Sequence, residues 1–220
     1  MKSIPTLALL FVVTTTTRPL LTKSFTILPS CPRPRHSLTP LNAKVGIFSS
    51  TSTGHTEKIS TYIVNAMEQY DDQEITHQDI RDTTSQELMD QDSIIVGAPT
   101  WNTDAQNKRS GTGWDEWLYD TLPQLDLRGK KVAVFGLGDQ ESYSDYYCDA
   151  AGELYDLFVD KGATMYGFTS TEGYTYHSSK AERNDKFVGA MFDEDNQYEE
   201  SEGRAKAWVE QLKSEGFMEE

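Results

Sequence analysis

The 220-residue sequence has few cysteines, and its histidines show no spacing typical of a metal site. The cysteines are Cys31 and Cys148, and the four histidines are scattered at positions 36, 55, 77 and 177. We expect Cys31 to lie in a removable leader, which would leave Cys148 without a partner for an internal disulfide. A small buried side chain is the expected role of Cys148. No metal centre is predicted.

Acidic residues are absent from the first 42 residues, which carry five basic ones. Leu7–Val13 is an apolar stretch too short to span a bilayer and typical of the core of a signal sequence. The rest, up to Asn42, is rich in Ser, Thr, Pro and basic residues, like an organelle transit peptide. We predict a two-part leader over residues 1–42 that directs the chain into a plastid bounded by extra membranes. A secretory signal with a basic pro-segment is the alternative, and a disordered native tail is a third.

All 35 acidic residues and 15 of the 20 basic ones follow residue 42, so residues 43–220 carry a formal charge of −20. This charge argues against binding to nucleic acid or to an anionic membrane surface. It favours a basic protein partner found by electrostatic steering, although solubility alone would also explain it. Residues 43–220 are enough for one domain with a sizeable core. We expect a monomer that does not insert into membranes.

Apolar runs and amphipathic segments alternate along these residues. The predicted strands are Lys44–Phe48, Glu74–Asp79, Ser93–Pro99, Lys131–Gly136 and Thr164–Gly167. The predicted helices are Thr56–Tyr70, Ser85–Met89, Trp114–Thr121, Tyr146–Lys161 and a last one striped by Ala205, Trp208, Val209 and Leu212. Such alternation predicts an α/β fold with a doubly wound, five-stranded parallel sheet and helices on both faces.

The segment Val45–Glu57 is the most informative part of the chain. An apolar strand ends there in hydroxyl residues and one glycine, just before an amphipathic helix. Free backbone N–H groups and the positive end of the helix dipole favour an anion at such a place. The segment contains no Lys or Arg, and His55 follows Gly54 where a Walker motif needs lysine. We therefore predict a site for one phosphate held by neutral donors; an ordinary capped helix is the alternative.

Two further loops leave the carboxyl ends of predicted strands, where ligands bind in doubly wound sheets. Thr100–Gly113 contains Trp101, and Gly138–Tyr146 contains Tyr143. Together with the phosphate site, these aromatics suggest a flat ring held between Trp101 and Tyr143. Surface or core packing would explain either aromatic on its own.

At this point the residues resemble the flavodoxins, a family of small FMN-binding electron carriers, from Lys44 to the C-terminus. The family's phosphate loop reads Thr-x-Thr-Gly-x-Thr, and Thr51–Thr56 matches it. Pro99–Asn102 is similar to the family's first flavin loop, and Gly136–Gln140 followed by Tyr143 is similar to the second.

Two more segments extend the resemblance. Asp193–Gln197 is similar to an acidic stretch near the ribityl chain in some members, and Thr169–Asp185 resembles the insertion that splits the last strand in long-chain flavodoxins. The resemblance implies the following cofactor-binding residues: Ser49, Thr51, Ser52, Thr53, Gly54, His55, Thr56, Pro99, Thr100, Trp101, Asn102, Thr103, Gly136, Leu137, Gly138, Asp139, Tyr143, Asp145 and Asp195.

The resemblance also implies a function. Bound FMN would transfer single electrons between its semiquinone and hydroquinone forms, without catalytic residues or a metal. The acidic chain would push the potential of the anionic hydroquinone down. In a plastid, the implied partners are photosystem I as donor and ferredoxin–NADP reductase as acceptor, in ferredoxin's place.

The Trp101 loop departs from the family pattern. Asn107–Gly113 makes it longer than in the commonest bacterial members, and Asp104 stands where a glycine often lies. In the family, one peptide of this loop flips to bond the reduced flavin. The peptide between Asn102 and Thr103 is the match by position. Since neither residue is glycine, we expect the flip to cost more backbone strain here.

Two other classes of protein have a similar winding. A flavodoxin-like NAD(P)H:quinone reductase needs its own nicotinamide site, whereas here aromatics would cover both ring faces and a charge of −20 would repel NADPH. A phospho-receiver domain needs an acidic pair after the first strand and an aspartate after the third. Ser49-Ser50 and Pro99-Thr100 occupy those places, so the receiver hypothesis fails.

Overall fold

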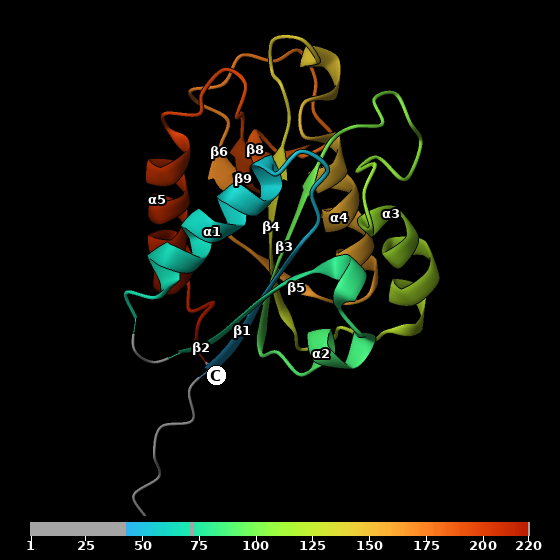
Figure 1. Ribbon diagram of the computed structural model, residues 1–220, viewed down its shortest axis with the longest axis vertical. Helices are drawn as coiled ribbons and strands as arrows, with labels where there is room; N and C mark the ends of the chain where they lie inside the picture. Colours follow the sequence, from blue (N-terminus) through green and yellow to red (C-terminus); the bar gives the residue numbers. More distant parts are fainter. Residues whose placement is uncertain (1–42, 71–72, 220) are drawn as a thin grey trace, which may run out of the picture. The chain divides into compact units, whose positions relative to one another are not determined.

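The computed structural model describes residues 43–70 and 73–219, so the predicted leader lies outside the described residues. A parallel sheet runs in the order β2-β1-β3-β4-β5, with β9 also paired to β4 (Figure 1). Its strands are β1 (Ala43–Ser49), β2 (Gln73–Asp79), β3 (Ser93–Pro99), β4 (Lys131–Leu137), β5 (Thr164–Tyr166) and β9 (Gly189–Phe192). This order has the switch point between β1 and β3 that the doubly wound prediction requires.

The last strand position is divided between two short strands. β5 pairs with β4 at Lys131–Ala133, and β9 pairs with it further along, at Val134–Leu137. The intervening insertion forms a small antiparallel sheet in the order β6-β8-β7. Its strands are β6 (Thr169–Ser170), β7 (Glu182–Arg183) and β8 (Lys186–Phe187). The predicted split of the last strand is therefore confirmed.

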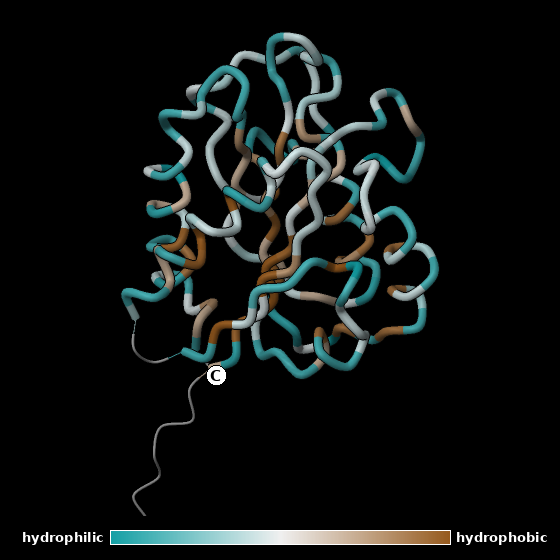
Figure 2. The backbone as a smooth tube through the Cα atoms, in the orientation of Figure 1, coloured by the Kyte–Doolittle hydropathy of each residue, from teal (hydrophilic) through white to brown (hydrophobic). Residues whose placement is uncertain are grey.

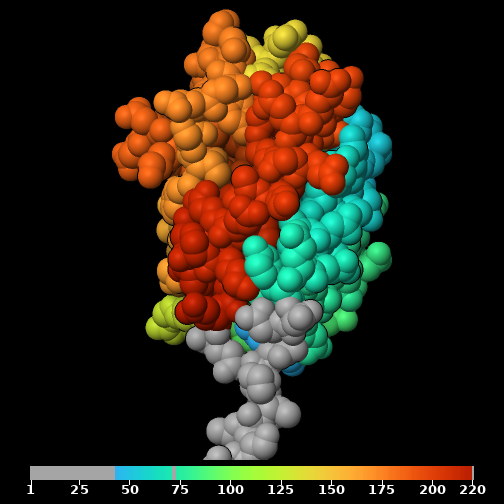
Figure 3. Space-filling model, turned by 90° about the vertical axis from the view of Figure 1, so that its left-hand side faces the viewer, coloured from blue at the N-terminus to red at the C-terminus, as the bar shows by residue number. Residues whose placement is uncertain are grey.

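Helices cover both faces of the sheet, as the alternation of elements predicted. The helices are α1 (His55–Met67), α2 (Ser85–Met89), α3 (Trp114–Glu116), α4 (Asp149–Asp160) and α5 (Ser201–Ser214). α3 continues into a π-helical turn, η2 (Trp117–Thr121), and the short 3-10 turns are η1 (Ile80–Asp82), η3 (Leu122–Gln124) and η4 (Ser144–Tyr146). α1 and α5 lie side by side on one face (Figures 1 and 3), and α3 and α4 lie on the other (Figure 1).

Side-chain alternation along the central strands divides the core into two layers. Val45 and Ile47 of β1 pack with Ile59 and Ile63 of α1 on one face, while Phe48 joins the core on the other. The most hydrophobic residues lie along the middle of the sheet (Figure 2). No helix in the described part of the chain is both long and apolar enough to cross a membrane.

The predicted start of the fourth helix at Tyr146 was wrong. α4 begins at Asp149, because Cys148 has a left-handed backbone (φ 54°) that ends the preceding turn. Tyr147 donates its N–H to the Ser178 carbonyl in the insertion, which holds this segment out of the helix. Cys148 itself is fully buried, as predicted.

Candidate functional site

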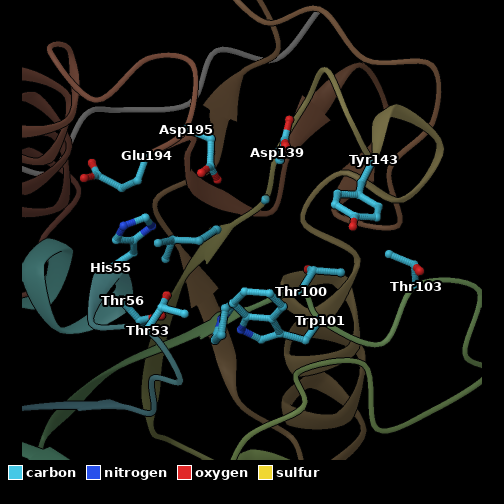
Figure 4. Close-up of a pocket in the computed structure, with 13 residues that line it drawn as sticks. Thr53, His55, Thr56, Thr100, Trp101, Thr103, Asp139, Tyr143, Glu194 and Asp195 are labelled. Atoms are coloured by element: carbon cyan, nitrogen blue, oxygen red, sulfur yellow. The ribbon is translucent and has the colours of Figure 1, made fainter.

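A pocket of about 290 Å³ opens beyond the carboxyl ends of β1, β3 and β4 (Figure 4). Loops that follow these three strands, and the one that follows β9, form its wall. The lining residues are Thr53, His55, Thr56, Pro99, Thr100, Trp101, Thr103, Leu137, Gly138, Asp139, Tyr143, Glu194 and Asp195. All of these except Glu194 were predicted from the sequence, so the structure brings the three predicted loops together.

The loop before α1 keeps several hydrogen-bonding groups free for a ligand. Gly54, the residue before the helix, has φ 94°, a conformation that glycine adopts most readily, and no side chain caps α1. Thr51 Oγ1 accepts a hydrogen bond from the Gly54 N–H at 2.9 Å, which shapes the loop. Thr56 Oγ1 is buried without a partner. An anion here would meet the helix N–H groups and this hydroxyl.

Two large aromatic side chains are exposed at the pocket. Trp101 is 51% exposed and Tyr143 is 55% exposed. They come from loops that are far apart in the sequence. Figure 4 shows both at the pocket, opposite His55 and Glu194. A flat apolar ligand between them would remove this surface from water and add stacking contacts.

Acidic side chains line the edge opposite Trp101. Burial raises the pKa of Asp139, but hydrogen bonds from Ser142, Asn196 and the Glu141 N–H outweigh burial and leave its pKa below the usual value. Asp139 is therefore ionised at neutral pH. For Asp195, burial and the nearby charge of Asp139 raise the pKa.

Glu194 is the pocket residue that sequence reasoning missed. Its side chain is almost fully buried and pairs with Lys58 Nζ of α1 at 2.7 Å. This hydrogen bond raises the pKa of Lys58. The second carboxylate oxygen, Oε1, is buried without a partner. The available signal was its place beside Asp195 in an acidic stretch that was itself recognised.

The remaining predicted residues lie near the pocket without lining it. Ser49 is buried and accepts a hydrogen bond from Ser60 Oγ at 2.9 Å, inside the β1–α1 interface. Gly136 lies in β4, where a Cβ would come within 2.6 Å of Ala151. Asn102 donates to the Lys108 carbonyl, and Asp145 is exposed with its Oδ1 at 3.5 Å from His177 Nδ1. Thr51, Ser52 and Gly54 shape the loop before α1.

The residues described, 43–70 and 73–219, contain no group of three or more His, Cys, Asp or Glu that could hold a metal ion. What the site offers is an anion-binding helix terminus, two exposed aromatics and an acidic edge, all at the switch point of a doubly wound sheet. These features define a class of protein that binds a flat, phosphorylated ring.

Comparisons with known proteins specify the class further. The family model described as Flavodoxin matches residues 47–208. A flavodoxin of Nostoc sp. is 39% identical over 175 residues, covering 80% of this chain and 98% of its own length. One of Synechococcus elongatus is 40% identical over 174 residues, covering 79% of this chain and 98% of its own. A crystal structure of Fusobacterium nucleatum flavodoxin bound to flavin mononucleotide is 30% identical, with a TM-score of 0.68, and covers 78% of this chain and 98% of that one.

The chain belongs to the flavodoxin family. Flavodoxins are electron-transfer proteins and not enzymes. Family membership therefore argues against the quinone-reductase alternative.

Proposed function

We propose that this chain carries single electrons at low potential by means of non-covalently bound FMN. The observation that carries the proposal is the unpartnered Thr56 hydroxyl beside the uncapped α1, in a pocket that also exposes two aromatics. The phosphate would bind at Thr51–Thr56, and the ring would lie between Trp101 and Tyr143. The divided last strand supports the long-chain type.

The chain's own residues would set the conditions for electron transfer. When bound, FMN supplies the one-electron chemistry. Trp101 and Tyr143 would cover the ring and limit its contact with water. The ionised Asp139 carboxylate at the pocket wall makes added negative charge on the bound ring unfavourable. It would therefore lower the reduction potential of FMN.

Stepwise reduction of the FMN-loaded protein, followed by absorbance, tests this proposal. We expect two separate one-electron steps. A single two-electron step, together with steady oxidation of NADPH by the protein alone, would instead support the reductase.

Photosystem I as donor and ferredoxin–NADP reductase as acceptor are the proposed partners. The charge of −20 on residues 43–220 supports docking to basic surfaces, and relatives from Nostoc and Synechococcus fit a photosynthetic role. Flash kinetics with photosystem I across a salt series is the test, because screening lengths fall from about 30 Å at 0.01 M to about 10 Å at 0.1 M. Pure steering predicts a steady fall in the second-order rate constant.

A maximum at intermediate salt would mean that strong attraction first traps unproductive orientations, which also supports charge-guided docking. A flat profile would contradict it. Glu141→Gln/Asp145→Asn, on the Tyr143 loop, should weaken the salt dependence more than Glu68→Gln/Glu74→Gln. The second pair removes the same charge from exposed positions at the end of α1 and the start of β2.

We further propose that residues 1–42 are a two-part leader that directs the chain to the plastid stroma and is removed. The apolar Leu7–Val13 stretch and the acid-free basic segment after it support this proposal. Fusing residues 1–42 to a fluorescent protein in an alga with a complex plastid would test it. Fluorescence in the plastid is expected, whereas secretion of the fusion would support the alternative.

A further inference from the structure

A buried carboxylate on α4 holds the far end of the Trp101 loop. Glu153 is only 4% exposed. Its two oxygens accept hydrogen bonds from the backbone N–H groups of Lys108 at 2.7 Å and Arg109 at 2.8 Å. The Tyr119 hydroxyl also donates to it. A buried charge is tolerated only when hydrogen bonds compensate it, and here three donors converge on one carboxylate.

The same two loop residues connect Glu153 to Trp101. The Arg109 carbonyl accepts from both the Trp101 N–H, at 3.1 Å, and the Asn102 N–H, at 3.0 Å. Lys108 has φ 56°, an uncommon conformation for a residue other than glycine, which persists only when its surroundings enforce it. Glu153 thus places the 108–109 backbone, and that backbone places the start of the loop.

Arg109 makes the loop a compact unit. Its guanidinium lies about 4.0 Å from the Glu153 carboxylate and donates to the carbonyls of Ala105 and Gln106. A second carboxylate, Asp115, accepts from the backbone of Ser110 and Gly111. Asp115 lies in α3, directly after the loop in sequence, whereas Glu153 ties the loop to α4, which packs on the sheet.

We propose that Glu153 is a positioning residue for the FMN ring, acting on Trp101 through the Lys108–Arg109 backbone. The inference rests on the proposed function for the ring, but the anchoring itself can be measured without FMN. Glu153 is absent from the pocket lining, so it would not contact FMN directly, and its hydrogen bonds reach the ring only through the loop. The additional length of this loop, Asn107–Gly113, would then bring its backbone within reach of α4.

The experiment compares three variants with the wild-type protein. Glu153→Gln keeps the shape of the side chain. Its amide NH2 group, however, would face a backbone N–H of the loop that needs an acceptor. Tyr119→Phe removes the hydroxyl that donates to Glu153 and leaves both backbone bonds. Asp149→Asn alters another buried carboxylate of α4, which accepts from the Lys180 N–H in the insertion; its interaction with the Trp101 loop is limited to longer-range attraction to Arg109.

Amide hydrogen exchange of the apoprotein is the first measurement. In Glu153→Gln we expect exchange at Trp101 and Asn102 to be about tenfold faster, the scale of one disrupted buried hydrogen bond to a charged group. In Tyr119→Phe and Asp149→Asn these two amides should stay close to wild type after correction for global stability. Unchanged exchange in Glu153→Gln, or equal acceleration in Asp149→Asn, would overturn the anchoring.

FMN affinity and the midpoint potentials are the second measurement. Glu153→Gln should weaken FMN binding about tenfold and shift at least one potential, while Tyr119→Phe stays near wild type. Faster exchange at Trp101 with unchanged FMN affinity would overturn the positioning role. Failure of the wild-type protein to bind FMN would instead refute the proposed function and leave the exchange result standing.

Discussion

The loop before α1 and the two loops that carry aromatics border the same pocket but are built in opposite ways. In the loop before α1, the helix N-terminus has no side-chain cap and Thr56 Oγ1 is buried without a partner. In the aromatic loops, remote carboxylates satisfy the backbone. Asp193, fully buried, accepts from the Gln140 N–H of the Tyr143 loop, and Glu153 accepts from the Lys108 and Arg109 N–H groups of the Trp101 loop.

The contrast separates two tasks that polar groups perform in a binding site. A buried group without a protein partner carries a desolvation cost that a ligand can remove, so at the pocket such a group is a candidate contact for the ligand. A fully bonded loop gains little from the ligand's polar atoms. Its bonds hold an aromatic face in place before the ligand arrives, which lowers the ordering cost of binding.

The largest expected effect comes from removing the phosphate. Riboflavin should bind at least about a hundredfold more weakly than FMN, because it loses several hydrogen bonds to a charged group. FAD should also bind poorly, since the loop offers neither room nor charge for a second phosphate. Isothermal titration of the apoprotein measures all three. Equal affinity for riboflavin and FMN would refute the assignment of the loop before α1.

Tyr143 tests the aromatic side of the comparison. Tyr143→Ala should weaken FMN binding by about 1–3 kcal/mol, the scale of one stacking contact between a base and an aromatic side chain. Tyr143→Phe should be much milder because it keeps the ring face. Fluorescence titration of both variants is the measurement, and equal losses would mean that the hydroxyl matters rather than stacking.

A threonine pair tests whether unpartnered groups mark the ligand. Thr56→Val should weaken FMN binding by about 1 kcal/mol while leaving the apoprotein at least as stable, because the buried hydroxyl has no partner to lose. Thr51→Val removes the acceptor of the Gly54 N–H and should destabilise the apoprotein loop as well. Urea unfolding and FMN titration of each variant separate the two roles. A clear loss of apoprotein stability in Thr56→Val would contradict the contrast.

The smallest effect concerns acid stability on the Tyr143 loop. The pKa of Asp139 is depressed in the folded protein, so its contribution is present above the unfolded value of about 3.8 and is lost as pH falls through the folded pKa. As the pH is lowered below about 3.8, the free energy of unfolding of the apoprotein should decrease more steeply in wild type than in Asp139→Asn. Urea unfolding across this range measures the difference. Equal slopes in the wild type and Asp139→Asn would contradict the prediction.

Much of the fold was predictable because its signals are local. The run Ile94–Pro99 is apolar, and the predicted strand Ser93–Pro99 forms a central strand with those bounds. The start of α4 could not be predicted, because a contact between Tyr147 and Ser178 sets the backbone there. Helix-favouring composition alone contains no trace of a partner 31 residues away.

In the candidate site, too, residues with a local sequence signal were predicted and residues whose roles depend on distant contacts were not. The loop before α1 was found because its donors are consecutive, and the aromatics because each follows a strand. Glu194 and Glu153 were missed because their roles depend on partners distant in sequence, Lys58 and the Lys108–Arg109 backbone. Ser49 shows the converse: it belongs to a matching motif, yet it bonds to Ser60 inside the core.

Cys148 offers a way to time the opening of this region. It is the one cysteine among residues 43–70 and 73–219, it is fully buried, and burial raises its thiol pKa. A Cβ on Gly138, in the pocket wall, would lie 3.3 Å from its sulfur, so the two segments must part before a reagent can enter. The rate at which a reagent labels this thiol would therefore report how often the Tyr143 loop opens, and a bound ring would slow the labelling.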